Sequence, residues 1–107
     1  MKVIKKQREI LNDLIGKKNL LAVGVNNYSN NEFGNLNKAC NDAETIFYTF
    51  KNVLNLNLDI SKSKLLLSND TKSDATRENI LYQLKRIVSE TEYEENIVFY
   101  FSGHGHK

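Results

Sequence analysis

The chain has 107 residues, which suits one small domain, and its 40% hydrophobic and 26% charged residues are ordinary for a folded globular protein. The formal net charge of +2 is too small to predict nucleic-acid binding, and the sequence has no run of eighteen apolar residues that would predict a membrane span. A single cysteine excludes an intrachain disulfide framework. These features predict a cytoplasmic protein with no nucleic-acid or membrane partner.

Residues 1–18 are predicted to form a basic segment separate from the main domain. They carry six lysine or arginine side chains against two acidic ones. Apolar residues recur at helical spacing from Ile4 to Ile15, and Gly16 follows where a helix would end. The segment is therefore expected to be an amphipathic helix with a solvated basic face, the alternative being a polyanion-binding arm. The domain proper is then expected over residues 19–107.

The next two elements predict a strand with a helix packed on it. Leu20–Val25 is an apolar run too short for a helix, and turn-forming asparagines follow it. Gly24 in this run is expected to let a helix approach the strand closely. From Ala39 onward apolar residues recur every three or four positions, which predicts one helix face. This face consists of Ala39, Cys40, Ala43, Ile46, Phe47, Phe50, Val53 and Leu54.

The remaining elements complete an α/β pattern. Lys64–Leu67 predicts a short strand, and Thr76 can cap a helix with an apolar face. That face consists of Ile80, Leu81, Leu84, Ile87 and Val88. Ile97–Phe101 is apolar at every position, as is typical of a central strand covered on both faces. Three strands separated by two helices predict a parallel sheet with right-handed helical crossovers.

In open parallel sheets, functional groups gather beyond the carboxyl ends of the strands. The loops at 26–42 and 102–106 lie at this edge. His104 stands between two glycines, so its ring can project from the strand end and act as a general acid or base near neutral pH. An exposed loop histidine is the alternative. His104 and His106 could also hold a metal, but no cysteine or acidic partner is close in sequence, which makes that signal weak.

Cys40 is the only candidate thiol nucleophile. It falls on the inward stripe of the second predicted helix, where a cysteine behaves as a small hydrophobe and burial disfavours the thiolate. Asn41 and Asp42 are expected in the first turn of that helix, where their side-chain oxygens would satisfy free N–H groups. Asp42 would also lie at the functional edge of the sheet.

Four stretches, in their order and spacing, resemble the amino-terminal part of the caspase and metacaspase family of cysteine endopeptidases. They are LLAVGVNNYSN, LNKACNDAETIFYTF, SDATRENILYQLKRI and NIVFYFSGHG. The most specific elements are SGHG after an apolar strand and NDAE at the start of a helix. The resemblance runs from Leu20 to Gly105. It implies a three-layer α/β/α sandwich of which residues 19–107 contain the first three strands.

The resemblance also implies roles for individual residues. His104 matches the catalytic histidine, which assists thiolate attack on a peptide or protein substrate and protonates the leaving amine. Asp42 and Ser102 match residues that line the primary specificity pocket of metacaspases, which implies cleavage after Arg or Lys through charge pairing. Gly103 and Gly105 would support the histidine turn and the oxyanion site.

The sequence departs from the family pattern at two points. Ala39 stands where many metacaspases have a cysteine, and Cys40 takes the adjacent, usually aliphatic position, so the resemblance does not make Cys40 the nucleophile. The nucleophile of the family follows its histidine by roughly 50 residues, whereas three residues follow His104 here. The chain is therefore expected to be a truncated domain that is inactive alone.

These departures define the expected partners. A cysteine-bearing carboxy-terminal segment or a homologous chain would be needed for hydrolysis. No cofactor is expected in this chain. Calcium is an expectation only for a full-length relative, because its site would lie in the missing part. The alternative function is a non-catalytic binding or regulatory module that docks through the open edge of strand 97–101.

Overall fold

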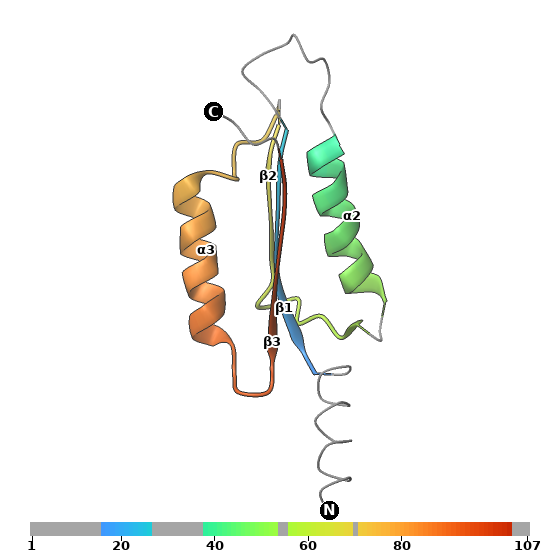
Figure 1. The fold of residues 1–107 in the computed structure, drawn as a ribbon, viewed down its shortest axis with the longest axis vertical. Helices are drawn as coiled ribbons and strands as arrows, with labels where there is room; N and C mark the ends of the chain where they lie inside the picture. Colours follow the sequence, from blue (N-terminus) through green and yellow to red (C-terminus); the bar gives the residue numbers. More distant parts are fainter. Residues whose placement is uncertain (1–15, 27–37, 54–55, 70, 104–107) are drawn as a thin grey trace, which may run out of the picture.

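The structure is a computed structural model that describes residues 16–26, 38–53, 56–69 and 71–103. These residues form one parallel sheet of three strands with a helix on each face (Figure 1). The elements are β1 (Lys18–Val25), α2 (Lys38–Asn52), β2 (Lys64–Ser68), α3 (Arg77–Glu90) and β3 (Asn96–Gly103). The predicted α/β fold with a parallel sheet is confirmed. Helix 3–15 was predicted in a segment that lies outside the described residues.

The strand order is β2-β1-β3, so β1 is the central strand. Six consecutive residues of β1 are buried. In contrast, every second residue of β3 is exposed, and the described residues contain no strand on its outer edge. The prediction that Ile97–Phe101 is covered on both faces is therefore wrong for the described part of the chain. Among the described residues, β3 is an edge strand with exposed apolar side chains, which agrees with the expectation of an apolar strand edge.

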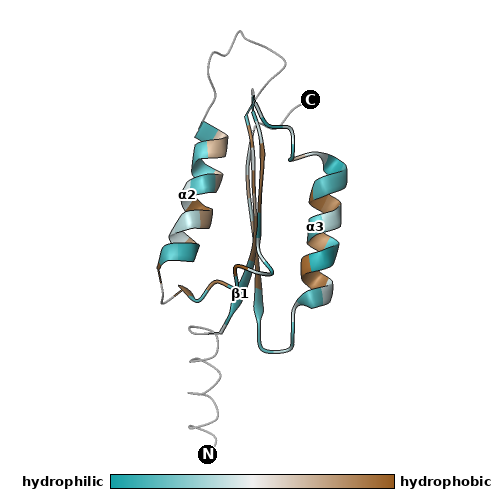
Figure 2. Ribbon diagram, turned by 180° about the vertical axis from the view of Figure 1, so that it is seen from behind, coloured by the Kyte–Doolittle hydropathy of each residue, from teal (hydrophilic) through white to brown (hydrophobic). Residues whose placement is uncertain are grey.

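The core has two layers, one on each face of the sheet, because successive strand residues point to opposite faces. On one face, Leu20 and Ala22 of β1 pack with Phe47 of α2. On the other face, Leu21 and Val23 pack with Ile87 of α3. The hydropathy colouring shows the hydrophobic residues concentrated in the strands between the two helices (Figure 2). Within the described residues, no helix has the length and hydrophobicity needed to cross a bilayer.

The predicted helices are largely confirmed, with corrections at their margins. Thr76 caps α3, and its hydroxyl oxygen accepts the backbone N–H of Asn79 at 3.1 Å. Helix α2 ends at Asn52, so Val53 lies beyond it and is 43% exposed. Leu81 and Val88 were predicted on the core face of α3, but they are 43% and 54% exposed.

A polar network joins the elements at the amino edge of the sheet. The carboxylate of Glu95 accepts hydrogen bonds from Asn19 Nδ2 at 3.0 Å and from Lys62 Nζ at 2.9 Å. It also accepts the backbone N–H of Glu92 at 3.1 Å. The hydrogen bond from Asn19, followed by that from Lys62, lowers the pKa of Glu95 from 4.5 to about 2. The ionised carboxylate thus ties the turn before β3 to the central strand and to the turn before β2.

This network predicts a specific acid sensitivity. Because the pKa of Glu95 is lower in the folded chain, its ionised form stabilises the fold above pH 4.5, and this contribution is lost as the pH falls toward 2. The wild-type melting temperature should therefore fall more steeply between these pH values than that of Glu95→Gln. Thermal unfolding followed by circular dichroism measures both slopes. The exposed neighbour Glu94 gives the control, since Glu94→Gln should keep the wild-type slope, and equal slopes for wild type and Glu95→Gln would contradict the prediction.

Candidate functional site

The carboxyl ends of the three strands meet at one edge of the sheet. Val25 lies opposite Ser68 of β2 on one side and opposite Gly103 of β3 on the other. One step earlier along β1, Gly24 lies opposite Ser102. Strand β3 therefore brings Ser102 and Gly103, the first two residues of the SGHG motif, to this edge, directly beside the central strand. His104, Gly105 and His106 lie outside the described residues, so their predicted roles stay predictions.

The start of α2 is attached to the same edge by Asn26, the residue after β1. The side-chain oxygen Oδ1 of Asn26 accepts the backbone N–H of Cys40 at 3.0 Å. Its own backbone N–H donates to the carbonyl of Ser68 at 2.9 Å. A free N–H at the start of a helix is thus satisfied from the end of a strand, and the helix is held against the sheet.

The prediction that Asn41 and Asp42 occupy the first turn of the helix holds for Asn41 and is wrong for Asp42. Helix α2 begins at Lys38, and its first turn contains no acidic residue. Asp42 lies one turn further along and is exposed. The capping role of Asn26 was missed because the donor and the acceptor are 14 residues apart in sequence. An asparagine directly after a buried strand was the available signal, but it does not identify the partner.

Gly24 allows α2 to lie unusually close to the sheet, as predicted. A Cβ atom at this position would lie 2.7 Å from the carbonyl oxygen of Ala39, 2.8 Å from Cα of Cys40 and 2.9 Å from Cβ of Ala43. Real Cβ atoms essentially never approach other heavy atoms this closely. Only glycine therefore permits the observed packing of the first turns of α2 on β1.

Cys40 lies inside this contact and is 3% exposed. Its thiol is within hydrogen-bond distance of two backbone carbonyls, those of Ser68 at 3.3 Å and Gly24 at 3.4 Å. Its side chain packs with Ala43 and Leu67. The prediction that Cys40 is a small core residue is confirmed. A substrate carbonyl cannot reach this sulfur without displacing α2 from the sheet.

The two residues predicted to bind substrate belong to the same face of the sheet. Ser102 pairs with Gly24, so it lies on the α2 face, and it is half-buried. Asp42 is exposed on α2, in the amino-terminal part of the helix, which packs against Gly24. No hydrogen bond between the Asp42 and Ser102 side chains is found among the described residues. The fold thus brings their elements to one edge, while their contact with a substrate stays a prediction.

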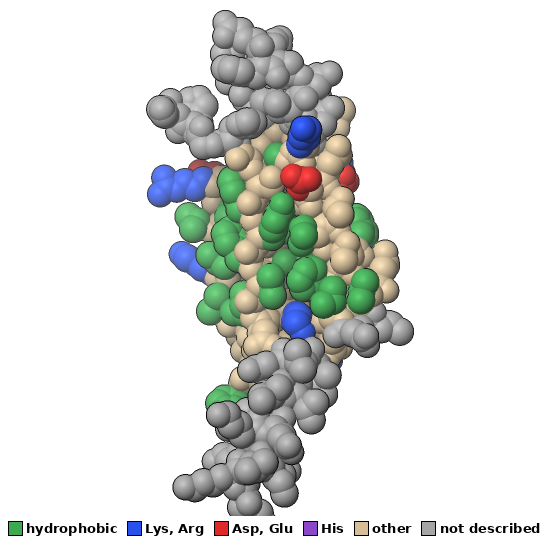
Figure 3. Space-filling view, turned by 45° about the vertical axis from the view of Figure 1, so that its right-hand side comes forward, with side chains coloured by type: hydrophobic (Ala, Val, Ile, Leu, Met, Phe, Trp, Pro, Cys, Tyr) green, Lys and Arg blue, Asp and Glu red, His purple; other side chains and the backbone are tan. Residues whose placement is uncertain are grey.

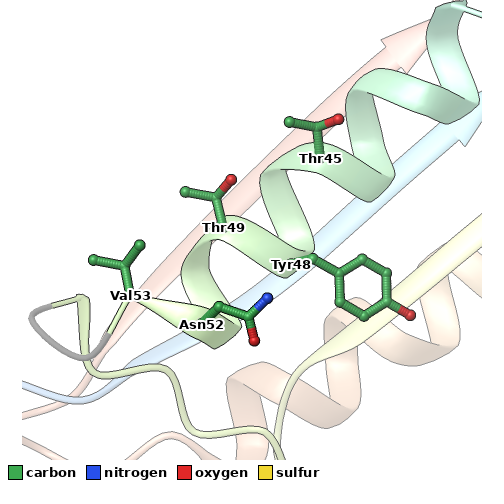
Figure 4. A pocket seen from close by; sticks show the side chains of 5 residues that line it. All are labelled: Thr45, Tyr48, Thr49, Asn52 and Val53. Carbon is green, nitrogen blue, oxygen red and sulfur yellow. The ribbon is translucent and has the colours of Figure 1, made fainter.

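The remaining surface of α2 offers no comparable chemistry. A shallow pocket lies on its carboxyl-terminal half and is lined by Thr45, Tyr48, Thr49, Asn52 and Val53 (Figure 4). In the space-filling view, hydrophobic side chains occupy the middle of the visible surface, and charged side chains lie around them (Figure 3). In the described ranges, no group of three His, Cys, Asp or Glu residues could hold a metal ion. The strand ends therefore remain the candidate site.

A family model described as "Metacaspase, peptidase C14 domain" matches residues 17–107. The match begins one residue before β1 and covers all five described elements, together with the positions of Asp42, Ser102 and His104. Comparisons with curated proteins and with solved structures gave no match. The parallel sheet, with Ser102 and Gly103 at its carboxyl edge, agrees with the family match. The chain therefore belongs to the metacaspase peptidase C14 domain family.

Proposed function

We propose that this chain supplies the histidine-bearing part of a cysteine endopeptidase domain that cleaves peptide bonds after Arg or Lys. The observation that carries the proposal is the position of β3, which ends beside the central strand at the edge where α2 begins. His104 follows Gly103 directly and would enter the chemistry from this position. Membership of a peptidase family supports the same assignment.

The thiol must come from a cysteine-bearing segment, because Cys40 is the only cysteine of the chain and lies in the core. His104 would take the proton from the incoming thiol, and the thiolate would attack the carbonyl carbon of the substrate. When the carbon–nitrogen bond breaks, His104 would return the proton to the leaving amine. Water would then hydrolyse the thioester. A reducing compartment such as the cytoplasm would keep the thiol free for this chemistry.

Asp42 and Ser102 would select the substrate. Asp42 presents an exposed carboxylate on the α2 side of the edge, and Ser102 lies on the same face of the sheet. A carboxylate near the cleaved bond favours a guanidinium or ammonium group through charge-assisted hydrogen bonds. Substrates with Arg or Lys before that bond would therefore react faster than substrates with a neutral or acidic residue there.

Complementation tests this function directly. The chain alone should not cleave Arg- or Lys-containing fluorogenic peptides, and adding the cysteine-bearing segment of a full-length metacaspase, expressed separately, should produce cleavage. The control segment has serine in place of its cysteine and should give no activity. A complex that forms with the cysteine-bearing segment but cleaves neither type of peptide would contradict the proposal.

A regulatory module without catalysis is the second candidate. It is favoured by the outer edge of β3, where the described residues provide no neighbouring strand. Such a module would form a stable complex with a homologous chain and lower that chain's activity. The complementation experiment separates the two candidates, because only the first predicts a gain of cleavage.

A further inference from the structure

Asn26 lies directly after β1, where the ends of two strands meet the start of α2, and it is 6% exposed. Its Oδ1 accepts the backbone N–H of Cys40 at 3.0 Å, and its own backbone N–H donates to the carbonyl of Ser68 at 2.9 Å. Burying a polar side chain costs free energy unless its hydrogen bonds are made. An apolar residue would avoid this cost, so the buried asparagine indicates that the position of α2 depends on its side chain.

The contact between Asn26 and Cys40 is part of a closed ring of hydrogen bonds. The thiol of Cys40 is 3.3 Å from the carbonyl oxygen of Ser68, the same oxygen that accepts the backbone N–H of Asn26. The start of α2 is thus held from the ends of two neighbouring strands, β1 and β2. Sliding or rotation of α2 on the sheet would break at least one of these hydrogen bonds.

The two residues predicted to select the substrate lie close to this ring along the chain. Asp42 follows Cys40 by two residues in the same helix. Because a helix has a regular rise of about 1.5 Å per residue, the place of the Cys40 N–H determines the place of the Asp42 backbone. Ser102 pairs with Gly24, two residues before Asn26. Asn26 therefore connects the helix of Asp42 to the strand pair that contains Ser102.

We propose that Asn26 is a positioning residue for substrate selection, which sets the place of Asp42 relative to Ser102 through the N–H of Cys40. The inference rests on the proposed function, in which Asp42 and Ser102 bind an Arg or Lys side chain, and it adds the residue on which their spacing depends. Charge-assisted hydrogen bonds require a defined distance and orientation, so a small displacement of α2 weakens them. The burial of Asn26 keeps its own side chain away from the substrate.

The cap of α3 provides a matched control for this inference. The hydroxyl oxygen of Thr76 accepts the backbone N–H of Asn79 at 3.1 Å, which is the same kind of bond that Asn26 makes to α2. Helix α3 packs on the opposite face of the sheet and contains none of the predicted site residues. Loss of either cap should lower stability by a similar amount, but only the loss of Asn26 should displace Asp42.

Steady-state kinetics of the chain completed with the cysteine-bearing segment tests the inference, using matched peptides with Arg or a neutral residue before the cleaved bond. Asn26→Ala should lower the preference for Arg by about tenfold, mainly through a higher KM, since a misplaced binding group can cost this much. Asn26→Asp keeps an oxygen acceptor and should keep the preference, as should Thr76→Ala. If circular dichroism shows that Asn26→Ala does not fold, Asn26→Gln takes its place, because its longer side chain moves the acceptor by one methylene group.

A double variant gives a readout that a purely structural role would not change. In a chain that already contains Asp42→Asn, Asn26→Ala should not lower the preference for Arg any further, because the carboxylate that Asn26 positions is absent. Residues that act through one another show such non-additive effects, whereas independent residues have effects that add.

Several outcomes would overturn the inference. These are a wild-type preference in the folded Asn26 variant, an equal loss for Arg and neutral peptides, the same loss of preference in Thr76→Ala, or additive effects in the double variant. If the wild-type chain in the complex cleaves Arg peptides and any of these is found, the proposed function stands and this inference fails. If the wild-type complex cleaves neither peptide, the proposed function fails and the inference fails with it.

Discussion

Replacing His104 by alanine in the domain completed with a cysteine-bearing segment should lower kcat/KM by roughly 10²–10⁴-fold, the usual contribution of a positioned general acid–base. The loss should be the same for peptides with Arg, Lys or a neutral residue before the cleaved bond. This uniformity follows from the proposed role of the histidine, which would act on the thiol and the leaving amine and not on the side chain of the substrate. Steady-state kinetics on matched fluorogenic peptides measures it.

Asp42→Asn gives the comparison for this prediction. It removes the charge but keeps the size of the side chain, so it should slow cleavage only of Arg and Lys peptides, by roughly 10–100-fold, in line with hydrogen bonds to charged groups. Binding of the cysteine-bearing segment should be unchanged in both variants. A His104→Ala domain that keeps activity within about twofold of wild type would exclude the acid–base role, which normally contributes far more.

The parts of the fold that could be predicted from sequence are those determined by local patterns. The apolar run of β1 and the three-or-four spacing of α2 each identify an element without knowledge of the rest of the chain. The cap of α3 is also local, because Thr76 and Asn79 are three residues apart. Gly24 was assigned correctly for a physical reason, since a glycine inside a buried strand usually marks a close approach of backbone.

The features that sequence reasoning missed depend on contacts between distant segments. Asn26 caps α2 across 14 residues, and no local pattern links this asparagine to Cys40. The exposure of Val88 and Phe99 likewise depends on which elements cover them, whereas periodicity reports only that a residue is apolar.

The candidate site was predicted from a motif and a topological rule in combination. The resemblance identified Asp42, Ser102 and His104, and the rule for parallel sheets predicted that their loops lie at one edge. The structure confirms the common edge for the elements that carry Ser102 and Asp42. It adds that Asn26 and Gly24 position the helix of Asp42, which indicates that changes in the strand core should affect the site.

Gly24→Ala is the most direct test of that coupling, and it should lower the melting temperature by roughly 5–15 °C. The new methyl group would lie less than 3.0 Å from backbone atoms of Ala39 and Cys40. Backbone cannot rotate away as a flexible side chain can, so α2 must move from the sheet, and such overpacking typically costs about 1–3 kcal/mol. In a domain of this size, each kcal/mol corresponds to about 4–8 °C. Replacing glycine also restricts the unfolded chain and can stabilise a protein by about 0.4–1 kcal/mol, but this gain is smaller than the steric cost.

Gly103→Ala is the matched control for stability. Its Cβ would lie 3.2 Å from two atoms of the Phe101 ring and 3.2 Å from the carbonyl oxygen of Val25. Because the ring of Phe101 is half exposed, it can turn aside, and the drop in melting temperature should be clearly smaller than for Gly24→Ala. In the completed domain, Gly24→Ala should also weaken the proposed preference for Arg and Lys, because Asp42 moves with α2. A Gly24→Ala chain that melts at the wild-type temperature would show that α2 is not held at the strand in the way described.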